Sequence, residues 1–169
     1  MFRIRTPWIG RRTALSGLAA VLGVAASRPL GSARAALNSN LTPTPGQTEG
    51  PFYPPNWLGD TDNDLVLVKG EDAQAMGTVL HVRGRVMDHA GQPVAGAIVE
   101  IWQCDANGVY HHPWDEQGRR KADAGFQGRG RVETDGEGRY VFRTIKPAAY
   151  SGRTPHIHFK IMQPGGDTL

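Results

Sequence analysis

The sequence contains little cysteine and no long apolar run, and both absences narrow the possible architectures. Cys104 is the single cysteine among 169 residues, so a disulfide within the chain is impossible. It lies in the strand-like run Ile98–Cys104, where we expect it to be a buried, small apolar residue. The apolar run Ala14–Ala26 is too short and too weakly apolar to span a bilayer. No amphipathic helix of ordinary length is present after residue 36.

Acidic residues are absent from residues 1–35, although six of the 19 basic residues lie there. The remainder has 13 basic against 16 acidic residues, so the high isoelectric point does not indicate nucleic-acid binding. The basic start, the apolar run and the small residues of Ala33-Arg34-Ala35 predict an export signal that is cleaved before Ala36. The pair Arg11-Arg12 resembles a twin-arginine signal, a route that exports folded proteins, including those that acquire a metal in the cytoplasm. We expect a periplasmic or extracellular protein without a membrane segment after cleavage; an ordinary secretory signal or an uncleaved anchor is the alternative.

The residues after the signal predict an arm followed by a β-rich domain. Residues 36–76 are rich in Pro, Thr, Asn and Gly, which is typical of an extended N-terminal arm and linker. Residues 77–169 contain short strand-like runs separated by Gly and Pro turns, which predict an all-β domain, an antiparallel β-sandwich. The expected strands are Val79–Met87, Ala97–Gln103, Gly130–Thr134, Tyr140–Ile145 and the stretch from His156 onward.

Two details of this sandwich follow from its turns. The turn Asp135-Gly136-Glu137-Gly138 predicts a hairpin that joins Gly130–Thr134 to Tyr140–Ile145. The sequence ends shortly after the turn signal Pro164-Gly165-Gly166, with no returning strand. We therefore expect the sandwich to be C-terminally incomplete, with an exposed edge.

The most informative stretch of the chain carries two histidines that alternate with apolar residues. His156 and His158 share one face of an expected strand, whereas Ile157, Phe159 and Ile161 take the other face. Two imidazoles on one strand face can share a metal ion.

Tyrosines extend this candidate metal site. Tyr110 and Tyr150 each follow a turn signal at the end of a strand, where side chains can converge at one end of a sandwich. A phenol ligates as an anion only beside a strong Lewis acid, and two tyrosinates with two neutral imidazoles suit ferric iron. The spacing also allows zinc or copper, with Cys104, His111 or His112 as a further ligand.

An ordered series of motifs resembles the intradiol ring-cleavage dioxygenases, the family of the catechol, hydroxyquinol and protocatechuate enzymes. The motifs are Val82–Asp88, Gly91–Ala97, Glu100–Gln103, Asp105–Tyr110, Phe126–Gly128, Thr134–Pro147 and Arg153–Phe159. Thr48–Pro55 resembles the entry segment of the family. The resemblance covers Gln47 to Met162, and the ordered series is more specific than any one motif.

The resemblance implies a β-sandwich that holds one non-haem Fe(III) through Tyr110, Tyr150, His156 and His158. Tyr110 matches the tyrosine that stays bound, Tyr150 the tyrosine that leaves the iron when substrate binds, and Arg153 the arginine beside the substrate. The implied reaction uses O2 to cleave a catechol-type ring between its two hydroxylated carbons, which gives a cis,cis-muconate-type diacid. Tyr150 then accepts a proton from the diol, and Arg153 stabilises negative charge on the substrate.

Two other classes of protein are alternatives. The pattern from Gly84-Arg85-Val86 to Gly96-Ala97 also occurs in carboxypeptidase-regulatory-like and transthyretin-like modules, which bind or brace without catalysis. A zinc or copper hydrolase or carrier could use the two histidines. The five candidate site residues together distinguish the dioxygenase hypothesis, because a non-catalytic module does not need them.

Overall fold

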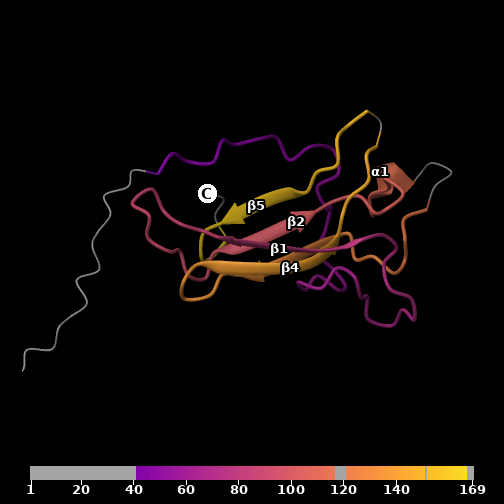
Figure 1. Ribbon diagram of the computed structural model, residues 1–169, viewed down its shortest axis with the longest axis horizontal. Helices are drawn as coiled ribbons and strands as arrows, with labels where there is room; N and C mark the ends of the chain where they lie inside the picture. The colour runs from indigo at the N-terminus through magenta and orange to yellow at the C-terminus, as the bar shows by residue number, and fades with distance from the viewer. Residues whose placement is uncertain (1–40, 117–120, 151, 167–169) are drawn as a thin grey trace, which may run out of the picture. The chain divides into compact units, whose positions relative to one another are not determined.

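The structure, a computed structural model, describes residues 41–116, 121–150 and 152–166, and these residues form two antiparallel β-sheets (Figure 1). One sheet pairs β1 (Val79–Arg85) with β4 (Arg139–Ile145). The other has the order β3–β2–β5, with β2 at Ile98–Trp102, β3 at Arg129–Glu133 and β5 at His158–Met162. The all-β, antiparallel prediction is confirmed. Within the described ranges the single helix is α1 (Pro113–Glu116), and no helix there is long and apolar enough to cross a membrane. The predicted export signal lies outside the described residues.

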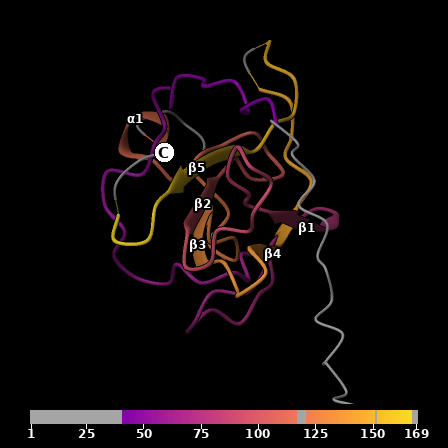
Figure 2. The ribbon, with the colours of Figure 1, turned by 90° about the vertical axis from the view of Figure 1, so that its left-hand side faces the viewer.

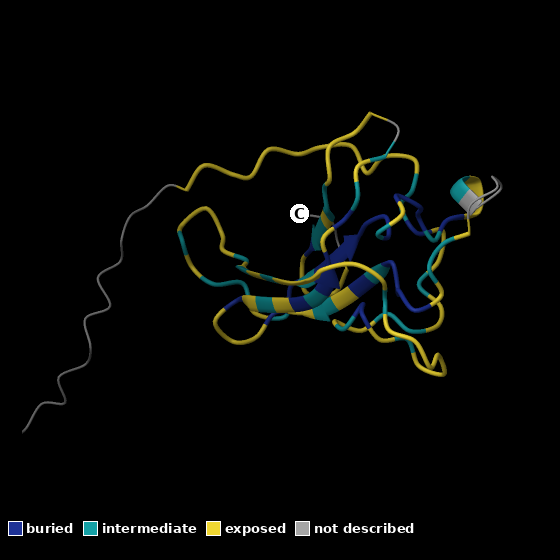
Figure 3. Ribbon diagram, turned by 45° about the vertical axis from the view of Figure 1, so that its right-hand side comes forward, coloured by how far each residue is buried: buried dark blue, intermediate teal, exposed yellow. Residues whose placement is uncertain are grey.

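The core lies between the two sheets and is filled by the alternating side chains of their strands. Figure 3 shows the buried residues, in dark blue, in the strands and in segments beside them. Val99 and Ile101 of β2 and Phe142 of β4 are fully buried in it. Leu65 and Val66 belong to the segment that the sequence predicts as an arm and linker, yet they are fully buried in the same cluster. The amide of Leu65 donates to a carbonyl of β4 at 2.8 Å, which fixes this segment to the sheet. Part of the expected linker therefore completes the core.

The predicted hairpin between β3 and β4 is wrong. β3 pairs with β2 and β4 pairs with β1, so the turn at 135–138 carries the chain from one sheet to the other (Figure 2). Thr134 at the end of β3 donates its hydroxyl to the Val94 carbonyl and accepts the Ala97 amide. These bonds hold the end of β3 beside the start of β2. A turn motif predicts a reversal of the chain, but the pairing partner of each strand depends on contacts that are distant in sequence.

Three turns share one aspartate motif, which begins at Asp88, Asp105 and Asp135. In each, the carboxylate Oδ1 accepts the backbone amides two and four residues further on, at 2.8–3.0 Å. The glycine at the fourth position donates to the aspartate carbonyl and has a φ of 74–77°. This backbone conformation strains any residue with a Cβ, so glycine is required there. The three turns differ mainly in burial, because Asp105 is fully buried whereas the other two are exposed.

Replacing Phe142 tests the position of the core. The change Phe142→Ala should lower the free energy of unfolding by about 3–5 kcal/mol, because it removes a fully buried ring and leaves a cavity. The neighbouring change Val141→Ala should cost less than about 1 kcal/mol, because Val141 is 40% exposed on the other face of β4. Urea unfolding of both variants measures the difference. Equal costs would contradict this assignment of faces.

Candidate metal centre

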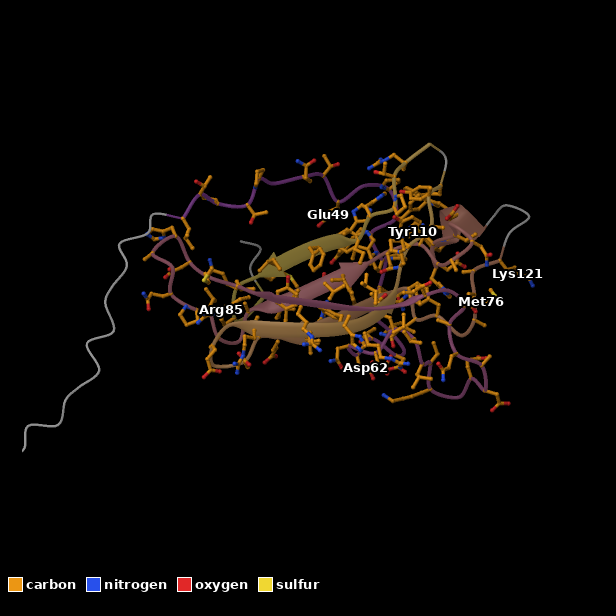
Figure 4. All side chains as sticks on the ribbon, viewed as in Figure 1. Glu49, Asp62, Met76, Arg85, Tyr110 and Lys121 are labelled. Carbon is orange, nitrogen blue, oxygen red and sulfur yellow. The ribbon has the colours of Figure 1, made fainter. Side chains whose placement is uncertain are left out.

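Four of the predicted site side chains converge at one end of the β-structure. The phenol oxygens of Tyr110 and Tyr150 are 3.3 Å apart. The ring centroids of His156 and His158 are 4.8 Å apart, and His156 lies 5.6 Å from the ring of Tyr150. The ring centroids of Tyr110 and His158 are 6.2 Å apart, so each of the four rings neighbours at least two others of the cluster. Figure 4 shows Tyr110 beyond the end of β2, among side chains from the surrounding loops.

The buried aspartate turn positions Tyr110. Asp105 Oδ1 fixes the turn, and its Oδ2 accepts the Asp123 amide at 2.9 Å, which ties the long loop to the same point. The Tyr110 amide donates to Asp115 Oδ2 at 2.7 Å. A Cβ added to Gly108 would lie 3.1 Å from the Cβ of Tyr150, so this glycine also allows the two tyrosine segments to approach.

Burial sets the protonation states of two members of the cluster, Tyr110 and His158. Burial raises the pKa of Tyr110 well above its ordinary value, and the hydrogen bond to Tyr150 and the proximity of that phenol act in the same direction. Without a strong Lewis acid, Tyr110 is therefore a neutral phenol. Burial lowers the pKa of His158 to about 4, with the charges of His156 and Arg153 acting in the same direction. His158 is therefore a neutral imidazole at pH 7, which is the state that binds metals.

His156 has the arrangement of a metal ligand. Its Nδ1 lies 2.6 Å from the carbonyl of Thr154, a contact that places the ring proton on Nδ1 and the lone pair on Nε2. Nε2 is buried and has no hydrogen-bond partner among the described residues. Metal-binding histidines donate the other ring N–H to a carbonyl or carboxylate in this way. A buried lone pair without a partner, beside two phenols and a neutral imidazole, fits a metal ion.

The donor set also decides which ion fits best. Oxygen and imidazole nitrogen donors suit a hard or intermediate metal, and the raised pKa of Tyr110 favours a trivalent ion, which can hold this buried phenol as an anion. Cys104 is buried and burial raises the pKa of its thiol to about 11, so it is not a ready thiolate ligand. In the described part of the chain, no three His, Cys, Asp or Glu side chains are grouped to hold a metal.

The other candidate residues lie around this cluster. Arg153 is exposed, and its backbone exchanges hydrogen bonds with that of Tyr150 at 2.7 and 3.3 Å, so it stands at the rim. His112 is buried with its ring 5.7 Å from that of Phe52. His111 instead places Nε2 2.9 Å from the carbonyl of Asp123 in the long loop. The roles of these residues stay predictions.

Two aromatic side chains that the sequence analysis did not assign to the site form part of its wall. Trp102 stacks on His158 with centroids 4.8 Å apart and an interplanar angle of 11°. Phe52 stacks on Tyr110 at 4.6 Å and 21°. The signal for Trp102 was present in the alternation of β2, because Trp102 shares the outer face with Glu100 and pairs across the sheet with His158. Phe52 carried no comparable signal, because its contact is made by a segment without regular structure.

The structure thus combines an antiparallel two-sheet fold with a Tyr-Tyr-His-His cluster at one end, a set of side chains that can bind a metal ion. A family model described as "Dioxygenase" matches residues 48–169. The chain is 41% identical over 118 residues to a protocatechuate 3,4-dioxygenase beta chain of Burkholderia cepacia, which covers 66% of this chain and 50% of the relative. It is 31% identical over 138 residues to a catechol 1,2-dioxygenase of Candida albicans, which covers 71% of this chain and 43% of the relative.

Solved structures agree with these relatives. The dioxygenase domain of a dioxygenase carbohydrate-binding protein fusion from Streptomyces sp. SirexAA-E superposes with a TM-score of 0.56 at 34% identity, over 76% of this chain and 71% of that one. The chain thus belongs to the intradiol ring-cleavage dioxygenase family. It spans about half the length of the curated relatives that it matches, or less.

The buried turn before Tyr110 can be tested against its exposed counterpart. The change Asp105→Ala should lower the free energy of unfolding by about 3 kcal/mol or more, because three backbone amides lose a charged acceptor in a buried site. The matched change Asp88→Ala should cost clearly less, because water can replace the lost acceptor at an exposed turn. Denaturant unfolding compares the two variants, and an equal or larger cost for Asp88→Ala would contradict the proposed role of burial.

Proposed function

We propose that the protein is a non-haem, Fe(III)-dependent intradiol dioxygenase, which uses O2 to cleave a catechol-type ring between its two hydroxylated carbons and gives a cis,cis-muconate-type diacid. The observation that carries the proposal is the convergence of Tyr110, Tyr150, His156 and His158, with the buried Nε2 of His156 lacking a partner. The names of the relatives, which are protocatechuate, catechol and hydroxyquinol dioxygenases, support a catechol-type substrate.

The four converging side chains would hold the iron. Two tyrosinates balance two of its three positive charges, and neutral imidazoles from His156 and His158 complete the protein ligands. Bound Fe(III) would supply the Lewis acidity that binds a diol as a dianion and makes the ring reactive toward O2. The raised pKa of Tyr110 is consistent with this proposal, because only such an ion would hold a buried phenol as an anion.

The two tyrosines would differ in role because their surroundings differ. Tyr110 is 2% exposed, is packed under Phe52 and follows a turn fixed by a buried carboxylate. Tyr150 is only partly buried and precedes Gly152, whose φ is 76° and which has no heavy atom near its missing Cβ. The backbone at Gly152 therefore has open space beside it. We infer that Tyr150 leaves its place when the diol binds and that its phenolate oxygen accepts a diol proton.

Arg153 and the wall residues would act on the substrate. The guanidinium of Arg153 at the rim supplies a positive charge near the developing negative charge of the substrate. The rings of Phe52 and Trp102 exclude water from the inner side of the centre. A non-catalytic module of the transthyretin-like class accounts for the sheets, but it gives no reason for a buried histidine Nε2 without a partner.

Iron loading tests the metal assignment. Protein loaded with Fe(III) should be burgundy with broad visible absorption, and Tyr110→Phe should lose most of this colour and all measurable O2 consumption with catechol. The control Tyr140→Phe should keep both, because Tyr140 lies on β4 and packs against Phe142 and Phe159. Visible absorption, iron content and oxygen uptake are measured. A folded protein that takes up no iron and stays colourless would reject the dioxygenase proposal.

We further propose that the protein leaves the cytoplasm as a folded chain through a twin-arginine signal in residues 1–35. The changes Arg11→Lys and Arg12→Lys together keep the charge but remove the arginine pair, so precursor should accumulate in the cytoplasm. Cell fractionation with an antibody against the mature domain measures this. Unchanged export of the double variant would instead indicate an ordinary secretory signal.

A further inference from the structure

The segment of residues 49–57, called the strap here, borders the candidate metal centre on two sides. Gly50 has a φ of 77°, and a Cβ added to it would lie 3.5 Å from Cε1 of His158. Two residues later, the ring of Phe52 stacks on Tyr110 at 4.6 Å. The strap therefore touches one histidine and one tyrosine of the site directly.

A third contact reaches the centre through the sheet. The ring of Tyr53 meets Trp102 edge-on at 5.0 Å, and Trp102 stacks on His158 at 4.8 Å. Tyr53 therefore contacts Trp102, and Trp102 in turn contacts His158, so the strap supports the orientation of the His158 ring through Trp102. A displacement of the strap removes the support on the far side of Trp102.

The outer face of the β3–β2–β5 sheet carries a row of charges under the strap. Arg131 of β3 and Lys160 of β5 are the register partners of Glu100 on β2. The carboxylate of Glu100 is fully buried. Its Oε1 accepts from Arg131 Nε at 2.8 Å and also from Nη2, and its Oε2 accepts from the hydroxyl of Tyr53 at 2.8 Å. Both oxygens of a buried carboxylate are thus satisfied, one of them by the strap.

The two cations of this row, Arg131 and Lys160, also make cation–π contacts with aromatic rings of the strap. The guanidinium of Arg131 lies 4.5 Å from the ring centroid of Trp57, and the ammonium of Lys160 lies 4.4 Å from that of Tyr53. Lys160 Nζ is also 2.5 Å from Oε1 of Glu49 at the start of the strap. Trp57 Nε1 donates to the Tyr53 hydroxyl at 3.3 Å, so the ring that contacts Arg131 is bonded to the ring that contacts Lys160. Figure 4 labels Glu49 above β5, on the strap side of this sheet.

The energetics of this network favour a positioning role. Burial removes the hydration of the Glu100 carboxylate, so its pairing with the partly exposed Arg131 contributes little net stability compared with apolar residues of the same size. Directional bonds to a carboxylate, however, fix the position of their donors more sharply than apolar packing does. Glu100 is buried where the strap crosses the sheet, so strap position and the pairing of this carboxylate depend on each other.

We propose that Glu100, Arg131 and Tyr53 form a latch that holds the strap against the metal centre, which makes Glu100 and Tyr53 positioning residues for metal retention and for the orientation of His158. This inference rests on the Fe(III) centre proposed above. The latch touches neither the metal nor the substrate. It acts through the contacts of Gly50, Phe52 and Trp102 with the ligand side chains.

The test compares Tyr53→Phe and Glu100→Gln with the unchanged protein, each loaded with Fe(III). Tyr53→Phe removes only the hydroxyl that donates to Glu100, and Glu100→Gln removes the charge while keeping an acceptor. Both variants should release iron to a ferric chelator about tenfold faster, the size expected when support behind a ligand is lost. Their visible charge-transfer band should shift, and amide hydrogen exchange across residues 49–58 should become faster.

The control is Asp64→Asn, which removes the charge from another arginine–carboxylate pair, one that joins a loop to β4 of the other sheet. Asp64 accepts two bonds from Arg143 Nη1 at 2.8 and 3.0 Å. This variant should lose stability but keep the band position and the rate of iron release. Circular dichroism confirms that each variant folds. If Glu100→Gln does not fold, the result for Tyr53→Phe alone supports or overturns the latch.

The outcomes separate the latch from the proposed function. Faster iron release and a shifted band in Tyr53→Phe, with neither in Asp64→Asn, support the latch. Unchanged release and band in a coloured, folded Tyr53→Phe overturn the latch and leave the dioxygenase proposal intact. Equal changes in Asp64→Asn would also overturn it, since they would reflect general loss of stability. Unchanged protein that binds no iron rejects the proposed function, and the latch with it.

Discussion

The central constraint in this structure is that two phenols and two imidazoles are packed together at one end of the β-structure, with Tyr110 buried and the other three partly buried. Burial raises the pKa of Tyr110 and lowers that of His158, so both side chains are uncharged at neutral pH without a metal. It also leaves the Nε2 lone pair of His156 without a partner. Such an arrangement is costly for a purely structural element, and the proposed Fe(III) would offset the cost by supplying positive charge and bonds.

Much of the surrounding chain is organised to maintain that packing. The buried carboxylate of Asp105 fixes the turn before Tyr110 and holds the long loop at Asp123. On the outer face of the β3–β2–β5 sheet, the buried carboxylate of Glu100 accepts a hydrogen bond from the strap, which packs on Tyr110 and Trp102. Two buried acids, each fully hydrogen-bonded, therefore position the aromatic surroundings of the centre without belonging to it. The core between the sheets, by contrast, is apolar and contains none of the four candidate ligands.

The sequence predicts the regular parts of this molecule because their periodicity is local. The alternation in residues 156–161 places His158 and Lys160 on the outer face and Ile161 in the core, as the structure has them. Contacts that depend on long-range pairing could not be predicted. The turn at 135–138 indicates a reversal, but the exchange of β4 to the other sheet depends on contacts of Thr134 with residues near 95. The wall made by Phe52 is of the same kind, since nothing near it in the sequence specifies Tyr110 as its partner.

The most direct test of the account is the resonance Raman spectrum of Fe(III)-loaded protein, excited within its visible absorption band. If Tyr110 and Tyr150 are both ligands, the spectrum contains enhanced tyrosinate ring modes. Addition of a catechol then removes the contribution of one tyrosinate and introduces catecholate modes. A spectrum without enhanced tyrosinate modes, or one that a catechol leaves unchanged, would contradict the assignment of the centre.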